Sequence, residues 1–233
     1  MAVGPLLLVH SPLVGPSSWS RLAAVAAHSG LEVVVPDLTG TAHGPRPRWR
    51  ALVDDAAGAA AGLDRITVVG HSGAGALLPV IGERLGHRLG ALIFVDAVHP
   101  VPEGLHETGI ELAALLDAQT TDGRLAPWLD WWPVEVVESL LPSEADRATI
   151  ADDLPRLPRD FYDDAVSMPV GWTDGPCAYL QLSEAYADDR ERARRLGWPS
   201  ITLESSHLGI FTEPAPVLQA VLALADEVRR RSS

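Results

Sequence analysis

One serine, Ser72, stands where its side chain could act as a nucleophile. It ends an apolar, β-branched run within residues 66–75, which read Ile-Thr-Val-Val-Gly-His-Ser-Gly-Ala-Gly, and a helical pattern over residues 76–81 follows. A serine on a sharp strand-to-helix turn is held clear of the sheet, and the residues two before and two after it must be small. Gly70 and Ala74 meet this need, although Ala74 replaces a usual glycine. A plain glycine-rich turn would share these residues, so the rest of the chain must decide.

A serine hydroxyl is a weak nucleophile at neutral pH and needs a base to accept its proton. His207 is the best candidate for this base, because it follows the last predicted strand, residues 200–203. Open parallel sheets gather their active sites at the carboxyl ends of the strands. His10 and His43 occupy loops near the same edge and are weaker candidates for substrate contact. His71 is interpreted as structural or as part of a pocket wall.

The elements that must position these residues alternate between strand and helix in the first 98 residues. Such alternation predicts a parallel, doubly wound α/β sheet, with about six strands at residues 5–10, 33–35, 66–71, 91–95, 177–182 and 200–203. Residues 99–173 break the pattern and predict an inserted helical cap, with helices over 111–118, 134–141, 143–154 and 160–166. Its tryptophans either pack the cap on the core or form an aromatic pocket wall. The expected domains are a core of residues 1–98 and 174–233 and a cap of residues 99–173.

Composition limits the classes of partner. A formal net charge of −13 over 233 residues argues against nucleic acid and anionic membranes as partners. The start of the chain lacks the charged segment of a signal peptide, and no apolar run approaches the ~20 residues of a membrane span. The single cysteine forms no internal disulfide, and no Cys/His cluster has zinc-ligand spacing. We therefore expect a cytoplasmic protein that acts on a small molecule, with neither metal nor cofactor; a homodimer is left open.

Together, the serine turn, the inserted block and the late histidine resemble the α/β-hydrolase family over nearly the whole chain. The closest pattern is that of the small esterase and hydroxynitrile-lyase branch, whose first strand ends in a histidine followed by a glycine and a tryptophan. Here these residues are His10, Gly15 and Trp19. Residues 207–208, with Glu213-Pro214 following, resemble the family's histidine loop. The resemblance implies a Ser-His-acid triad that contains Ser72 and His207.

The acid of such a triad is open between two residues. Asp96 ends the strand after the serine turn, which is the position where haloalkane dehalogenases of this fold can carry their acid. The more usual family position follows strand 177–182, and alignment places Tyr186 there, with Glu184 close by. We favour Asp96, and Glu184 is the alternative.

The oxyanion hole departs from the family pattern. Such a hole needs two N–H groups aimed at the developing negative charge. By resemblance, Gly73 supplies one and the second residue after His10 supplies the other, but that residue is Pro12, which has no N–H. Either the amide of Leu13 takes its place, as we expect, or the hole is half-formed. Ser11 is expected to bind substrate through its hydroxyl, which is also an alternative donor in place of the lost amide.

The sequence thus predicts a cofactor-independent serine hydrolase, of carboxylesterase or thioesterase type, for a small or medium apolar acyl substrate. The departure at Pro12 keeps a second hypothesis open, in which the same scaffold is a lyase or cyclisation catalyst that uses the triad for acid/base chemistry. A third hypothesis is a ligand-binding protein with slow turnover, because fold alone does not determine function.

Overall fold

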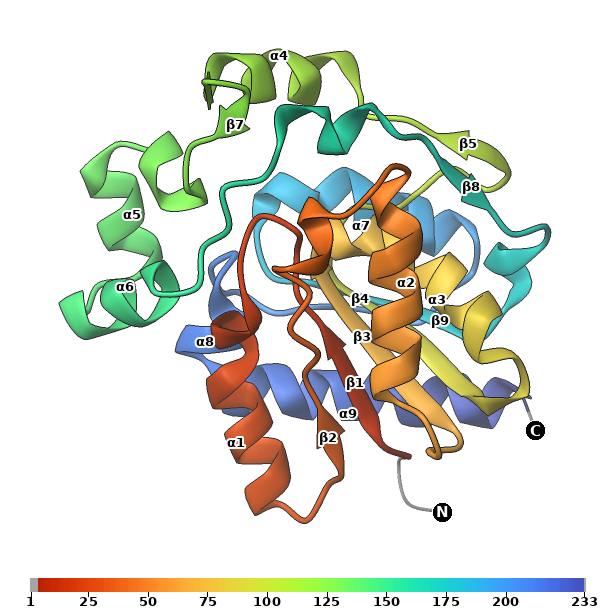
Figure 1. Cartoon of the computed structure of the whole chain (residues 1–233). Coiled ribbons are helices and arrows are strands. Elements are labelled where there is room, and N and C mark those ends of the chain that lie inside the picture. Colours follow the sequence, from red (N-terminus) through yellow and green to blue (C-terminus); the bar gives the residue numbers. More distant parts are fainter. Residues whose placement is uncertain (1–3, 233) are drawn as a thin grey trace.

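The central feature of the computed structural model, which describes residues 4–232, is a six-stranded sheet with helices on both faces (Figure 1). The spatial order is β10-β9-β4-β3-β1-β2, and every neighbouring pair is parallel. This confirms the predicted fold class; residues 1–3 and 233 of the expected core lie outside the described residues. The strands are β1 (Leu6–Val9), β2 (Val33–Val34), β3 (Ile66–Ser72), β4 (Leu89–Ala97), β9 (Cys177–Gln181) and β10 (Ser200–Thr202).

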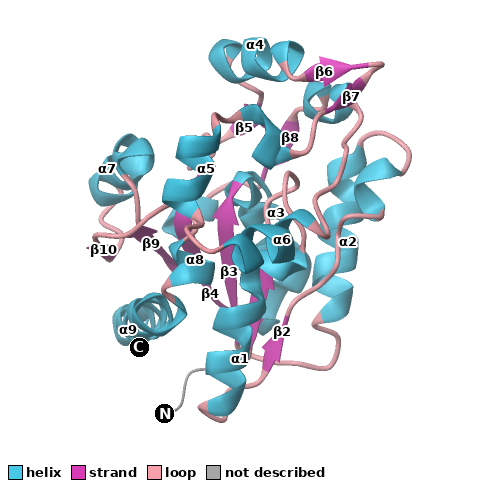
Figure 2. Ribbon diagram, turned by 90° about the vertical axis from the view of Figure 1, so that its left-hand side faces the viewer, coloured by secondary structure: helices cyan, strands magenta, loops and turns pink. Residues whose placement is uncertain are grey.

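Alternate side chains of each strand enter two different hydrophobic layers, as the two-residue period of a strand requires. In β1, Leu7 and Val9 pack with α2 and α3, whereas Leu6 and Leu8 pack with α1 and α9. Figure 2 shows helices on both sides of the sheet. Burial on both faces explains why these strands are continuous apolar runs in the sequence. The core helices are α1 (Ser20–His28), α2 (Arg48–Ala59), α3 (Leu78–Leu85), α7 (Ala187–Arg195), α8 (Gly209–Thr212) and α9 (Pro214–Ser232).

Residues 99–173, called the insertion below, connect β4 to β9 and lie over the carboxyl ends of the strands (Figure 1). The helix expected over residues 160–166 is wrong. A short 3-10 helix, Arg159–Asp163, is followed there by β8, which pairs antiparallel with β5. The side chains of β8 are alternately buried and exposed, which is the two-residue period of a strand and not of a helix. The insertion contains β5 (Gly104–His106), α4 (Ile110–Ala118), β6 (Thr120–Thr121), β7 (Arg124–Leu125), α5 (Val134–Leu140), α6 (Glu144–Ala151) and β8 (Val166–Met168).

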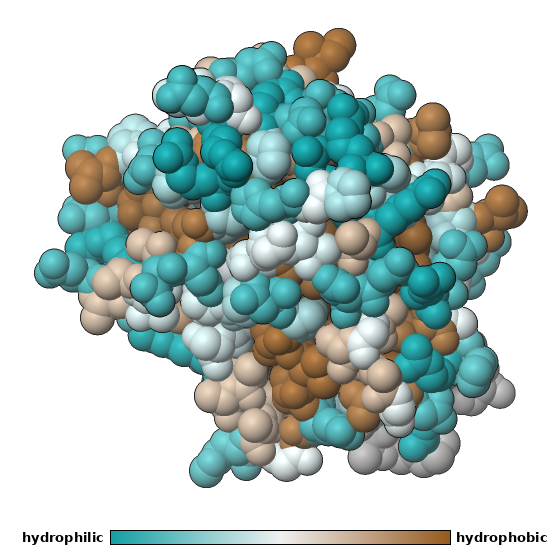
Figure 3. All heavy atoms as spheres, in the orientation of Figure 1, coloured by the Kyte–Doolittle hydropathy of each residue, from teal (hydrophilic) through white to brown (hydrophobic). Residues whose placement is uncertain are grey.

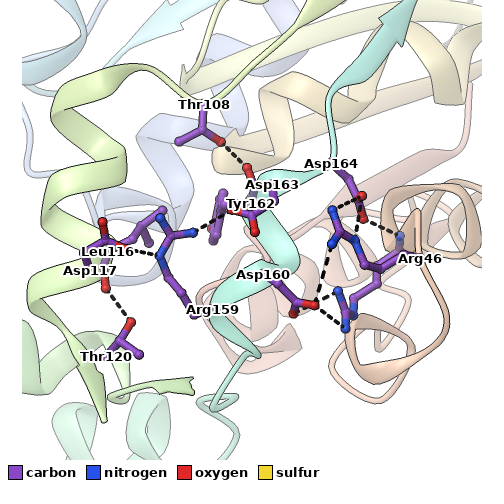
Figure 4. A network of polar contacts seen from close by, with 11 residues as sticks. Arg46, Thr108, Leu116, Asp117, Thr120, Arg159, Asp160, Tyr162, Asp163 and Asp164 are labelled. Atoms are coloured by element: carbon purple, nitrogen blue, oxygen red, sulfur yellow. Dashed lines mark hydrogen bonds and ion pairs between the residues drawn. The ribbon is translucent and has the colours of Figure 1, made fainter. Parts of the chain in front are cut away.

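Ion pairs join the insertion to the loop before α2 (Figure 4). Arg46 of that loop lies 2.7 Å from a carboxylate oxygen of Asp164 and 3.9 Å from one of Asp160. We call these two ion pairs the clasp. Within the insertion, Arg159 pairs with Asp117 at the end of α4 at 2.6 Å. The clasp therefore connects the core to the same segment that braces α4.

A second junction fixes the insertion to the loop before α1. The Asp153 carboxylate accepts hydrogen bonds from the backbone N–H and the hydroxyl of Ser17, at 2.7 and 2.6 Å. It also fills the space beside Gly15, where an added Cβ would lie 2.1 Å from its Cγ. A side chain at residue 15 would therefore displace the Asp153 carboxylate from Ser17. No helix among residues 4–232 has the length and apolarity needed to cross a membrane.

Candidate active site

Ser72 lies on a strained turn between β3 and the 3-10 helix η3 (Gly73–Leu77). Its φ of 56° falls in a region that residues other than glycine seldom adopt. The turn is possible because Gly70 has no side chain; an added Cβ would lie 2.7 Å from Leu78. The strand thus ends by presenting the Ser72 hydroxyl at the carboxyl edge of the sheet.

His207 lies beside Ser72, in the loop between β10 and α8. Its Nε2 is 3.2 Å from Ser72 Oγ, and its Nδ1 is 2.8 Å from Asp96 Oδ2. The backbone carbonyl of His207 accepts a hydrogen bond from His71 Nε2 at 2.8 Å. Burial lowers the pKa of His71 to about 3, so this ring is neutral. His71 therefore holds the loop that carries His207.

Asp96 is fully buried, and its carboxylate makes four hydrogen bonds. Oδ1 accepts from the backbone N–H groups of Leu182 and Ser183, at 2.8 and 2.9 Å, while Oδ2 accepts from Ser183 Oγ at 2.6 Å and contacts His207. Burial alone would raise the pKa of Asp96, but the hydrogen bonds and charge interactions with His207 and Ser183 outweigh it and leave this pKa below its usual value. An ionised carboxylate only accepts hydrogen bonds, so the Nδ1 of His207 carries a proton.

Tyr186 completes the group around Ser72, and sequence reasoning gave it no role. Its hydroxyl lies 3.2 Å from Ser72 Oγ, and its ring is parallel to His207, with centroids 5.2 Å apart. The signal that could have found it was its place in the alignment, at the usual position of the family's acid. Glu184, the alternative acid, is exposed, and the carboxylate on His207 Nδ1 belongs to Asp96.

The residues expected to form the oxyanion hole have different surroundings. Gly73 and Leu13 both line the cavity next to Ser72. The Leu13 N–H, however, is directed at Ser11 Oγ, 3.4 Å away. Ser11 itself is 2% exposed and lies behind the cavity wall, where its hydroxyl would be 3.1 Å from a Cβ added to Gly73. The structure therefore does not place the Ser11 hydroxyl on the cavity surface.

Two other histidines singled out in the sequence lie away from the Ser72 hydroxyl. His10 Nδ1 lies 2.9 Å from the Ser11 carbonyl oxygen, and its Nε2 accepts the N–H of Leu38 at 3.0 Å. Burial lowers the pKa of His10, which suits this neutral, structural arrangement. His43 is exposed and lies 3.4 Å from Arg124.

The family model described as "Alpha/beta hydrolase family" matches residues 6–220, which is most of the chain. The chain belongs to the α/β-hydrolase family. This confirms the resemblance indicated by the motifs around Ser72 and His207 and supports a hydrolase enzyme. Comparison with curated protein sequences gives no match.

Solved structures of similar fold come from plants and bacteria. Tomato methylketone synthase I complexed with 2-tridecanone has a TM-score of 0.74 at 16% identity, over 98% of this chain and 100% of that one. An extracellular α/β-hydrolase from a Paenibacillus species has a TM-score of 0.73 at 17% identity, and the match covers 94% of this chain and 98% of that one. A methylesterase from Arabidopsis has a TM-score of 0.69 at 17% identity, and the match covers 96% of this chain and 99% of that one. At sequence identities this low, the structural similarity shows a shared fold and nothing more.

In this α/β-hydrolase, a cavity of about 480 Å³ lies between the insertion and the strand ends. Several of its lining residues are exposed and mark its opening, among them Leu112 on α4, Trp132, and Val136 on α5. Figure 3 shows apolar side chains over α5, together with other apolar patches on the same face. The remaining apolar and aromatic lining comprises Pro12, Leu13, Trp49, Ala76, Leu77, Val98, Leu115, Trp128, Trp131, Leu140, Phe161, Tyr162, Val166, Ala185 and Tyr186.

The tryptophans of the insertion serve both roles that the sequence left open. Trp128, Trp131 and Trp132 line the cavity. Trp172 instead packs in the core, with its ring centroid 5.5 Å from that of Trp198. The tryptophans that the insertion contributes to the cavity wall therefore all come from the segment before α5.

Proposed function

We propose that this α/β-hydrolase is a cofactor-independent serine hydrolase, of carboxylesterase or thioesterase type, for a small or medium apolar acyl substrate. The observation that carries the proposal is the hydrogen-bonded series from Ser72 through His207 to Asp96, which opens into the apolar cavity. Nucleophile, base and orienting acid each have a partner within hydrogen-bond distance, as acyl transfer through a serine requires.

In the proposed reaction, Asp96 keeps the proton of His207 on Nδ1, so that Nε2 accepts the proton of Ser72. Oγ then attacks the acyl carbon, and the carbonyl electron pair moves onto oxygen, near the Gly73 amide. When this intermediate collapses, His207 returns the proton to the leaving group. Water then cleaves the acyl-enzyme with the help of the same base.

The cavity favours neutral substrates. Among the described residues that line it, none is an arginine, and the chain has no lysine. Burial lowers the pKa of the lining residue His106, so this ring is uncharged at neutral pH. Glu107 and Asp164 bring carboxyl groups to the wall. A substrate anion would find no cation there, which supports an uncharged acyl group.

A lyase or cyclisation reaction is the second candidate, and Pro12 is the observation that favours it. Pro12 lines the cavity beside Ser72 and offers no N–H to an oxyanion. Removing one donor from such a hole typically costs ~10²–10³ in rate. In the second candidate, Ser72 and His207 shuttle a proton and no acyl-enzyme forms.

Fluorophosphonate labelling followed by intact-mass spectrometry tests the proposal. We expect one adduct on the wild type, none on Ser72→Ala, and much slower labelling of His207→Ala, because the base activates the serine. Folded wild type that forms no adduct would contradict a nucleophilic serine. Ligand binding retained in Ser72→Ala, together with no turnover by the wild type, would instead indicate a binding protein.

A further inference from the structure

We propose that the phenolic hydroxyl of Tyr186 is a catalytic hydrogen-bond donor that stabilises the oxyanion, in place of the amide that Pro12 lacks. This inference rests on the serine hydrolase function proposed above and adds to it a residue outside the expected triad and oxyanion hole.

The direction of each hydrogen bond is determined by the buried carboxylate. Because Asp96 is ionised, the Nδ1 of a neutral His207 holds the proton and its Nε2 is the acceptor. The Ser72 hydroxyl must therefore donate to Nε2, which uses its one hydrogen. The remaining contact, from Tyr186 to Ser72 Oγ at 3.2 Å, then has the tyrosine as donor.

The phenol keeps its proton over the whole working range of a hydrolase. Burial raises the pKa of Tyr186 to about 12, although its hydrogen bond with Ser72 acts in the opposite direction. At neutral pH it is therefore a neutral O–H donor aimed at the reacting atom. Tyrosine hydroxyls are among the side-chain groups that can form part of an oxyanion hole.

Backbone donors other than the Gly73 amide are scarce beside Ser72. The Cδ of Pro12, which replaces an amide hydrogen, would lie 3.5 Å from a Cβ added to Gly73, so the proline ring faces the place where a second N–H is needed. The next amide, that of Leu13, points at Ser11 Oγ. The Gly73 amide is thus left without a backbone partner for the oxyanion.

The attack itself frees the tyrosine hydroxyl for this task. Once Oγ bonds to the acyl carbon, it becomes an ester-like oxygen and a poorer acceptor. The carbonyl oxygen is bonded to the same carbon and now carries the electron pair of the former double bond. A small rotation of the phenolic O–H redirects it from Oγ to this anion. Tyr186 keeps its proton throughout, and His207 carries the proton from Ser72 to the leaving group.

Tyr186→Phe is the decisive variant, because it removes the hydroxyl and retains the ring packed on His207. It is compared with the wild type on one ester and on its thiono analogue, in which sulfur replaces the carbonyl oxygen. We expect kcat/KM for the ester to fall by about 10²–10³, mostly through kcat. Because sulfur is a weak hydrogen-bond acceptor, we expect kcat/KM for the thiono ester to fall by less than about tenfold.

Tyr162→Phe is the matched control. Tyr162 lines the same cavity, so this variant removes the same group from another part of the wall. We expect it to change kcat/KM for the ester and the thiono ester by the same factor. Thermal unfolding of both variants checks that each is folded.

The outcomes separate this inference from the proposed function. Wild type that labels with fluorophosphonate and hydrolyses the ester, with a Tyr186→Phe variant that retains the wild-type kcat/KM on both substrates, would overturn the role of Tyr186 alone. An equal loss on both substrates would also overturn it, because that result describes a residue that only positions Ser72 or His207. Wild type with neither adduct nor turnover would overturn both.

Discussion

The buried carboxylate of Asp96 determines which nitrogen of His207 faces Ser72. Its Oδ1 is occupied by two backbone N–H groups, so only Oδ2 is directed at the imidazole. A carboxylate and an amide of the same shape would therefore act differently here. An asparagine would keep its carbonyl oxygen on the two backbone donors and turn its NH₂ group towards Nδ1.

We expect Asp96→Asn to lower kcat by about 10³–10⁴, because the NH₂ group would force the imidazole proton onto Nε2, the atom that must accept from Ser72. Steady-state ester hydrolysis measures this effect. Glu184→Gln is the control, since Glu184 is exposed and the bond to Nδ1 is made by Asp96. A large loss in Glu184→Gln and a small loss in Asp96→Asn would show that the acid is Glu184.

At the residue scale, some features of the site could be predicted from the sequence and others could not. The positions of Ser72, Asp96 and His207 could be inferred because each follows an apolar run that predicts a strand. The direction of the Leu13 amide and the burial of Ser11 could not, because they depend on the path of one loop after β1. The contact of Tyr186 with Ser72 joins residues 114 positions apart, and no local pattern encodes such a distance.

At the scale of elements, four neighbouring strands of the sheet each contribute one member of the site. Ser72 ends β3, Asp96 lies near the end of β4, and Tyr186 and His207 follow β9 and β10. In the sheet these strands lie side by side in the order β10-β9-β4-β3. Because all are parallel, their carboxyl ends meet at one edge, which made residues after the strands the candidates for the site. The choice of Asp96 as the acid came from the resemblance to α/β-hydrolases.

The insertion was less predictable than the sheet. Its strands β5 and β8 are three residues each and are separated by about 60 positions, so only their pairing makes them strands. Short segments of this kind carry little periodic signal. The attachment of the insertion to the core depends on ion pairs such as the clasp, and charged residues in a loop do not indicate their partners.

Loss of the clasp should loosen the insertion without unfolding the core. We expect Arg46→Ala to raise amide hydrogen exchange in residues 159–168 by no more than roughly two- to fivefold, because an exposed ion pair contributes little and Arg48 and Trp49 still bind the same segment. The urea midpoint of global unfolding should stay nearly unchanged.

Arg84→Ala is the matched control for this change. It removes an exposed pair with Asp54, 2.7 Å away, between the core helices α3 and α2. Exchange in residues 159–168 should not respond to it. Equal exchange in both variants, or no increase in Arg46→Ala, would show that the clasp does not restrain the insertion.

At the scale of the whole molecule, the net charge and the cavity lining favour the same class of substrate for the proposed function. The chain carries a formal net charge of −13, and the described cavity lining holds carboxyl groups but no arginine. Exposed apolar residues of α4 and α5 line this cavity where it reaches the surface. A neutral apolar acyl chain meets a continuous path of apolar side chains, whereas an anion meets repulsion outside and no partner inside.

A series of esters of one alcohol, with straight acyl chains of increasing length, tests this selection. We expect kcat/KM to rise by up to about fourfold per CH₂ group while each added group buries apolar surface, and to stop rising when the chain fills the cavity. Leu115→Trp, which adds volume to the lining on α4, should move this limit to shorter chains. An ester whose acyl chain ends in a carboxylate should be at least about 100-fold poorer than its neutral counterpart of equal length, because its charge would be buried without a cation. A profile that is flat with chain length, or equal rates for the neutral and carboxylate esters, would show that the acyl chain does not enter this cavity.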